Sequence, residues 1–244
     1  MKTNSRFVRF LKKNAIISNL IDNYGVRTVV FAGISLWLNV IYAIFNGVYA
    51  IIYKSGWYTA LCVYYFLLAF MRISVVFFQQ KRHISLKNNN TQEEQNKWKI
   101  TELKRYVYCG IGLTVMPLCL SIAILLIITN GRGYSYAGLT IYAVATYTFY
   151  KVISSIVNVV KAKKQDDYTI RALRNIGLAD SAVSLLALQT AMFSAFGQGA
   201  DTYLFNVLTG AGVCALTVII GVSMIYKGTK EQKELKKGIK NDEN

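Results

Sequence analysis

Six long apolar segments divide this chain of 244 residues, and the connections between them alternate between strongly basic and almost uncharged. A bilayer has a hydrocarbon core of roughly 30 Å, which a helix of roughly 20 residues can cross. Each segment reaches that length, so the sequence predicts an all-α fold, a polytopic membrane bundle of six transmembrane helices. The predicted spans are 28–53, 56–80, 106–129, 134–160, 176–198 and 203–226.

The positive charges predict the orientation of this bundle. Of the 28 lysines and arginines, 24 lie in four segments, namely residues 1–27, 81–105, 161–175 and 227–244. The remaining connections carry only Lys54 and Arg132. Short basic loops stay on the cytoplasmic side of a membrane. We therefore expect cytoplasmic N- and C-termini and three out-and-back hairpins in the inner (plasma) membrane of a bacterium.

The formal net charge of +16 raises the question of which partner the chain binds. A basic footprint can attract nucleic acid, but these charges flank the apolar segments. At that position, anionic lipids of the inner leaflet attract each lysine or arginine by about 1 kcal/mol. We expect the lipid bilayer with anionic inner-leaflet lipids as the partner and no nucleic acid.

Two polar segments outside the spans carry predictions of their own. Residues 6–21 place Phe7, Phe10 and Leu11 on one side at helical spacing, with basic residues opposite. This pattern favours an interfacial helix along the inner leaflet, and a basic tail that only fixes orientation is the alternative. The 81–105 connection has a run of Asn, Gln and Glu without apolar periodicity, which predicts a flexible solvated loop.

Two cations within spans, Arg72 and Lys151, are the first candidates for a functional site. Each lies about nine or ten residues before a basic cluster, which places it roughly 14 Å inside the bilayer. A cation at the helix centre costs about 2.5–3.5 kcal/mol, and snorkelling to the inner interface would relieve that cost. Side chains lean toward the helix N-terminus, which is the outer side for both spans. We therefore expect both cations to face protein.

Polar stripes accompany these cations. Around Lys151, polar residues recur at helical spacing, namely Tyr147, Thr148, Ser154, Ser155 and Asn158. The first span carries a second stripe, namely Ser35, Asn39, Tyr42, Asn46 and Tyr49. Polar groups in hydrocarbon need internal partners, so both stripes should face protein. They either line a common polar cavity or form hydrogen bonds between helices, each worth about 0.6 kcal/mol. For each asparagine alone we favour the interhelical hydrogen bond.

Asp180 is the acid closest to a span interior. Its depth allows it to pair with Lys151 or Arg72, so we interpret it as a structural cap or an ion-pair partner, with a direct role in a site as the alternative. In the last span, Gly210, Cys214, Thr217 and Gly221 form a face of small residues suited to close packing. Such a face, if unpaired, would permit a homo-oligomer or a protein partner.

Catalytic signatures are not apparent in this sequence. Its one histidine, His83, falls in the polar connection, and neither H-E-x-x-H nor G-x-S-x-G occurs. The four cysteines lack metal-ligand spacing, so we interpret them as small packing residues. We expect no enzymatic activity, no cofactor and no metal.

The stretch from Asn39 to Arg72, with Tyr-Ala-Ile-Phe-Asn-Gly and Trp-Tyr-Thr-Ala-Leu-Cys-Val-Tyr-Tyr, resembles uncharacterised six-span bacterial integral membrane proteins. The resemblance implies topology and no particular activity. Two hypotheses follow. The first is a small transporter or channel-like protein with an inward-facing polar cavity for an anionic solute or lipid headgroup. The second is a non-transporting scaffold or assembly partner that acts through its basic inner face. The candidate cavity residues are Arg72, Lys151, Asn158, Tyr147, Asn39, Asn46 and Asp180.

Overall fold

The computed structural model describes residues 24–54, 56–88, 91–130, 140–164, 166–196 and 202–242. All regular structure in these ranges is helical, in the order α3 (Tyr24–Tyr53), α4 (Gly56–Asn88), α5 (Gln92–Asn130), α6 (Thr140–Ala162), α7 (Tyr168–Phe196) and α8 (Thr202–Asp242). The helices α3, α4, α5, α7 and α8 are long and apolar enough to cross a membrane. The chain is therefore an all-α integral membrane protein. The shorter helix α6 is not among these five, so the count of six spans and the orientation of the termini stay predictions.

The helix ends at the almost uncharged connections agree with the predicted apolar segments. Helix α3 ends at Tyr53, α4 begins at Gly56 and α8 begins at Thr202. Lys54 follows α3 with a φ of 44°. A residue in this left-handed region commonly terminates a helix, so the chain reverses direction there within a short turn.

The 81–105 connection differs from the flexible loop that the sequence predicts. Helix α4 continues to Asn88 and α5 begins at Gln92, so most of this connection is helical. Lysine, glutamine and glutamate favour helix in water, and two glutamates occupy the first turn of α5, where negative charge is stabilising. Loss of hydrophobicity along the sequence therefore marks the edge of the apolar belt, the part of the bundle whose outer surface is hydrophobic. It does not mark the end of a helix. The predicted interfacial helix at 6–21 lies outside the described residues.

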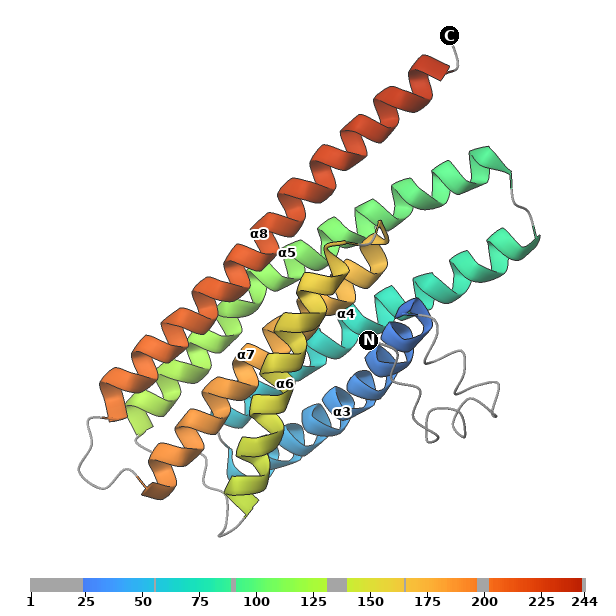
Figure 1. Ribbon diagram of the computed structural model, residues 1–244. Coiled ribbons are helices and arrows are strands. Elements are labelled where there is room, and N and C mark those ends of the chain that lie inside the picture. The colour runs from blue at the N-terminus through green and yellow to red at the C-terminus, as the bar shows by residue number, and fades with distance from the viewer. Residues whose placement is uncertain are drawn as a thin grey trace, which may run out of the picture.

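Helices α5 and α8 pack antiparallel along most of their shared length and form the longest contact of the bundle (Figure 1). Their approach is close, because a Cβ built on Gly221 would lie 2.7 Å from the carbonyl oxygen of Gly110. Thr217 and Met224 are buried on the same face of α8. The small-residue face of the last span is thus occupied by α5 of the same chain and is not an open surface for a second copy.

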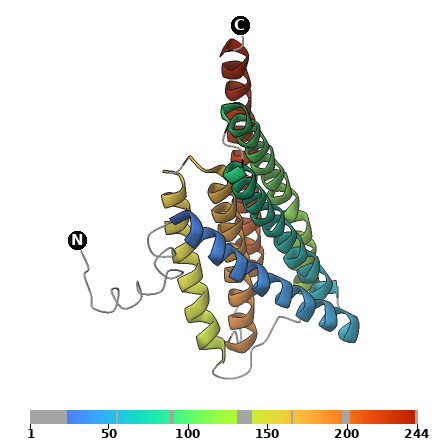
Figure 2. The ribbon, with the colours of Figure 1, turned by 90° about the vertical axis from the view of Figure 1, so that its right-hand side faces the viewer.

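In the described ranges, the helices of the second predicted hairpin, α5 and α6, have no extended contact with each other. Helix α3 packs on α4, but α6 packs on α7, while α5 packs on α8 and α4. Figure 2 shows α6 and α7 running side by side and α3 crossing the bundle obliquely. The physical reason is complementarity, since the polar stripe of α6 requires hydrogen-bonding partners and the small residues of α8 fit closely against α5.

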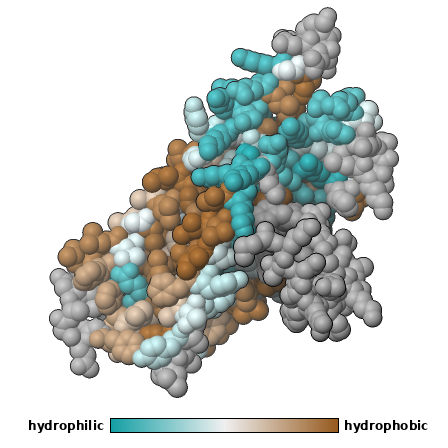
Figure 3. Space-filling model, in the orientation of Figure 1, coloured by the Kyte–Doolittle hydropathy of each residue, from teal (hydrophilic) through white to brown (hydrophobic). Residues whose placement is uncertain are grey.

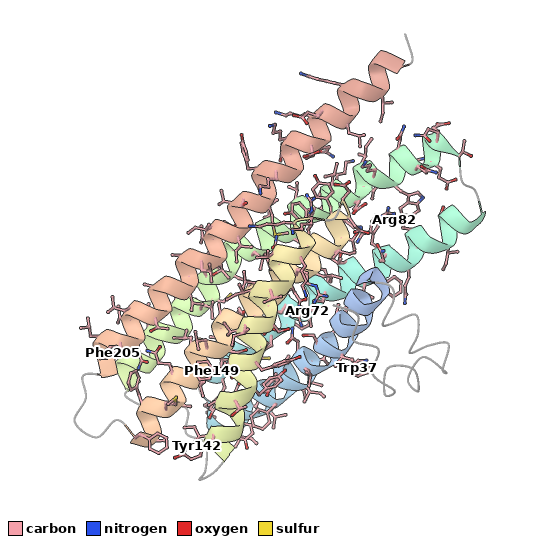
Figure 4. All side chains as sticks on the ribbon, in the orientation of Figure 1. Trp37, Arg72, Arg82, Tyr142, Phe149 and Phe205 are labelled. Carbon is pink, nitrogen blue, oxygen red and sulfur yellow. The ribbon has the colours of Figure 1, made fainter. Side chains whose placement is uncertain are left out.

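Charge and hydrophobicity separate along the bundle. Figure 3 shows most hydrophilic residues of this face gathered toward the end where α4 connects to α5, which we call the basic end, and mainly hydrophobic residues over the rest. Large apolar side chains point outward in that hydrophobic part. Trp37, for example, lies on the outer side of α3 and is 70% exposed (Figure 4). An exposed apolar surface of this extent is typical of a face that contacts lipid.

Candidate functional site

A buried ion centre joins α4, α6 and α7 in the middle of the bundle, where Figure 4 places Arg72. The Arg72 guanidinium donates to Oδ2 of Asp180 at 2.9 Å, and the Lys151 ammonium lies 3.0 Å from Oδ1 of the same carboxylate. Arg72 is 3% exposed and Asp180 is 1% exposed. We call these three residues the ion centre. Its two cations share one carboxylate, which leaves one positive charge of the ion centre unbalanced.

Serine hydroxyls complete the contacts of both cations. Arg72 also donates to the hydroxyl of Ser35, which α3 contributes, and Lys151 donates to the hydroxyl of Ser184 at 2.7 Å. On the next turn, Ser155 of α6 lies 2.5 Å from the hydroxyl of Ser181 on α7. Lys151 and Ser155 of the polar stripe of α6 therefore find partners on α7, and the contacts of the ion centre connect four helices.

Lys151 is the member of the ion centre that reaches the protein surface, with 21% of its side chain exposed. Tyr147, one turn earlier on α6, is 52% exposed. Its ring lies within electrostatic range of Asp180, Arg72 and Tyr42. An approaching ligand would therefore meet Tyr147 and Lys151 before the buried pair of Arg72 and Asp180.

Two buried polar side chains near the ion centre lack a hydrogen-bond partner. The amide nitrogen of Asn39 is unpartnered, and Asn39 lies one helical turn from Ser35 on α3. The hydroxyl of Tyr64 is also unpartnered, and its ring is fully buried within electrostatic range of Asp180 and Arg72. A buried donor without a partner is uncommon in native proteins and calls for an explanation, such as a bound ligand or water.

The structure brings together only part of the predicted candidate set. Arg72, Lys151 and Asp180 meet directly, and Tyr147 lies beside them. Asn46 donates to the carbonyl oxygen of Tyr42 on its own helix at 2.7 Å. Asn158 donates to the hydroxyl of Ser154, also on its own helix, at 3.2 Å. These two hydrogen bonds lie within single helices and do not involve the ion centre.

A second buried acid, Glu102, was missed by the sequence analysis. One of its oxygens accepts from the backbone N–H of Thr169 at 2.9 Å, and the other accepts from Arg82 at 2.8 Å. Arg82 also lies 3.8 Å from Asp167, whose other oxygen caps the first turn of α7. We call Arg82, Glu102 and Asp167 the basic-end clamp, because they fasten α4, α5 and the start of α7.

A signal for Glu102 was present in the sequence. Glu102 shares one helical line with Tyr106, Cys109 and Leu113, all of which are buried. Assigning residues 81–105 to a loop concealed this line, because helical spacing has no meaning in a segment without regular structure. A helical reading of 92–105 would have placed this carboxylate on the buried face.

These features define an all-helical integral membrane protein with a charged, buried centre between its helices. No known protein family, curated protein or solved structure matches the chain. Its chemistry is therefore inferred from the ion centre itself.

Proposed function

We propose that this protein is a small transporter or channel-like protein whose ion centre binds an anion, either a solute or a lipid headgroup. One observation carries the proposal: two cations from different helices share a single carboxylate in the interior of the bundle. In the part of the chain that the structure describes, Asp180 is the only acid in contact with either cation. An unbalanced buried charge is costly, and an anion beside Lys151 would neutralise it.

The donor count of the two cations supports anion binding. An ammonium has three N–H donors and a guanidinium has five. Lys151 faces Asp180 and Ser184, which leaves one donor for a ligand, and Arg72 has further donors beyond its contacts to Ser35 and Asp180. A bound anion could replace Asp180 as the partner of Lys151, while Asp180 stays on Arg72. This exchange of partners would alter the attachment of α6 to α7, and we propose it as the transport step.

We further propose that all six helices cross the plasma membrane of a bacterial cell with the basic end in the cytoplasm. The supporting observation is the separation of the hydrophilic basic end from the hydrophobic remainder of the bundle (Figure 3). Helix α6 would cross beside α7, where Ser181, Ser184 and Asp180 satisfy its polar face. We assign neither catalysis nor a cofactor to the chain.

Anion flux from proteoliposomes tests the proposed function. The full chain is reconstituted, and efflux of chloride, phosphate, sulfate and acetate, together with transbilayer movement of phosphatidic acid, is compared with that of protein-free vesicles. We expect Lys151→Gln to reduce the flux of the transported anion at least tenfold and Lys151→Arg to retain it. Lys230→Gln, at an exposed position of α8, is the matched control and should have no effect. Equal flux in Lys151→Gln and the unmodified protein would refute the proposal.

A scaffold role is the second candidate, and the long basic end of α8 favours it. This helix continues to Asp242, and Lys227, Lys230, Lys233, Lys236 and Lys237 are exposed along it. Such a surface can bind acidic partners or anionic lipids. In this case, neutralising the α8 lysines, or Arg9, Lys12 and Lys13 of the N-terminal tail, should disrupt a complex resolved by native electrophoresis. Neutralising Arg72 or Lys151 should leave that complex intact.

A further inference from the structure

The ion centre lies behind a lateral seam between α3 and α6. Helix α3 packs on α4 and α6 packs on α7, but α3 and α6 have no extended contact with each other in the described ranges. Tyr42 of α3 is 47% exposed although it lies within electrostatic range of the half-exposed Tyr147 of α6. We define the lateral seam by these two tyrosines, one on each helix. Tyr147 lies one helical turn before Lys151 on α6.

The borders of the lateral seam combine aromatic, apolar and weakly polar side chains. On α3, Leu38, Tyr42 and Phe45 recur at helical spacing and are all partly exposed. On α6, the exposed residues around Tyr147 include Thr146 and Tyr150. Figure 3 shows a pale band of intermediate hydropathy over α6, which crosses the otherwise hydrophobic surface. Such a surface suits an acyl chain beside a polar head better than it suits a fully hydrated ion.

Along α4, side chains on both sides of the ion centre are packed against the bundle. Toward the basic end, Arg82 and Glu102 of the basic-end clamp hold α4 and α5 together at 2.8 Å. Toward the opposite end, Tyr64 and Leu68 of α4 are fully buried. The exposed part of the ion centre is Lys151, beside Tyr147 and the lateral seam. The described residues thus favour a ligand that arrives from the side.

We propose that the ligand is an amphiphilic anion, a lipid with a phosphate or carboxylate headgroup, that enters from the bilayer through the lateral seam. Its headgroup would contact Lys151 and Arg72, and its chain would lie between α3 and α6. The unpartnered amide of Asn39, one turn from Ser35, supplies a further donor on the same side of the bundle. The inference rests on the proposed function and specifies its ligand class.

A tether across the lateral seam tests this entry route. The full chain, with Cys62, Cys109, Cys119 and Cys214 replaced by alanine, receives Tyr42→Cys and Tyr147→Cys and is placed in phosphatidylcholine nanodiscs. A bis-maleimide then links the two positions. Binding of phosphatidic acid is measured by native mass spectrometry, and binding of inorganic phosphate by calorimetry. The same double variant without the linker is the control for the two substitutions.

We expect the linker to weaken phosphatidic acid binding at least tenfold, and inorganic phosphate to bind at least tenfold more weakly than phosphatidic acid. Lys151→Gln should weaken phosphatidic acid binding, while Lys151→Arg and Lys230→Gln should preserve it. Unchanged lipid binding after linking, or equal affinity for inorganic phosphate, would overturn lateral entry and leave the proposed function standing. Unchanged binding of both probes in Lys151→Gln would overturn both proposals, and no binding of phosphatidic acid by the unmodified chain would overturn lateral entry alone.

Discussion

Arg72 and Lys151 approach the same carboxylate from two different helices, one at each oxygen of Asp180. Arg72 belongs to the packed pair of α3 and α4, and Lys151 belongs to α6, which packs on α7. Asp180 therefore connects the pair α3 and α4 to the pair α6 and α7. Near the lateral seam these two pairs have little other contact in the described ranges. A change at this one acid should alter both stability and ligand binding.

Replacing Asp180 by asparagine should destabilise the protein by about 3 kcal/mol, because it leaves the buried Arg72 and the partly exposed Lys151 without a counter-charge. The measurement is unfolding of the purified protein in detergent. Arg72→Gln should cost less in the Asp180→Asn background than in the unmodified protein, since contacting residues are energetically coupled. Ser184→Ala, which removes the hydrogen bond that the Lys151 ammonium donates to a neutral hydroxyl, is the matched control and should cost less, about 1.5 kcal/mol. Additive effects of the two charge substitutions would show that the ion centre does not act as a unit.

Gly221→Ala should destabilise the contact between α5 and α8. The added methyl group would meet the hydroxyl of Thr114 and lie 2.7 Å from the carbonyl oxygen of Gly110, so the helices would have to separate. Overpacking of this kind costs about 1–3 kcal/mol. Gly212→Ala on the same helix, where a Cβ would meet no neighbouring atom within 4 Å, is the matched control. Thermal unfolding in detergent compares the two, and an equal melting temperature would contradict the described packing.

Glu102→Ala should loosen the start of α7. It removes the acceptor of the Thr169 N–H and the partner of Arg82 together, and the expected loss is about 2–3 kcal/mol because the acid is buried. Glu102→Gln retains an acceptor oxygen and should lose less. Glu234→Ala, in an exposed pair with Lys230, should have little effect. Hydrogen exchange at the amide of Thr169 reports the change, and unaltered protection in Glu102→Ala would argue against the basic-end clamp.

Cysteine labelling along α6 should distinguish the lateral seam from packed and lipid-facing positions. In the cysteine-free background, Tyr147→Cys should react with a small polar maleimide, because residue 147 borders the ion centre at a half-exposed position. Ser155→Cys should react slowly, since Ser155 contacts Ser181 of α7. Ile153→Cys, on an exposed apolar face, should remain unreactive in a bilayer because polar reagents do not enter hydrocarbon. Equal reaction at all three positions would contradict the arrangement.

The sequence was sufficient to predict the helical class and the residues of the ion centre. A charge within an apolar segment is rare and costly, so Arg72, Lys151 and Asp180 stand out without any structural information. The almost uncharged turns were also predictable, because the chain must leave the apolar belt within a few residues there. Tyr53 and Gly56 accordingly bound the first turn as expected.

Hydropathy could not predict helix pairing or the extent of helix beyond the apolar belt. The two spans of each hairpin were expected to pair, but α6 packs on α7 rather than on α5, through Lys151 and Ser155, a matter of partner geometry that hydropathy does not encode. Close packing of α5 on α8 depends on the position of Gly110 opposite Gly221, which no single segment reveals. Glu102 was concealed for a related reason, since a polar helix end and a polar loop have similar composition.

The continuous course of α8 has a mechanical consequence. At 41 residues it is about 60 Å long, roughly twice the thickness of the hydrocarbon core. No break in the helix separates its apolar part from the part that ends at Asp242. A rigid tilt of α8 about its contact with α5 would therefore move both parts together. A slight tilt within the lipid would become a sideways displacement at the far tip.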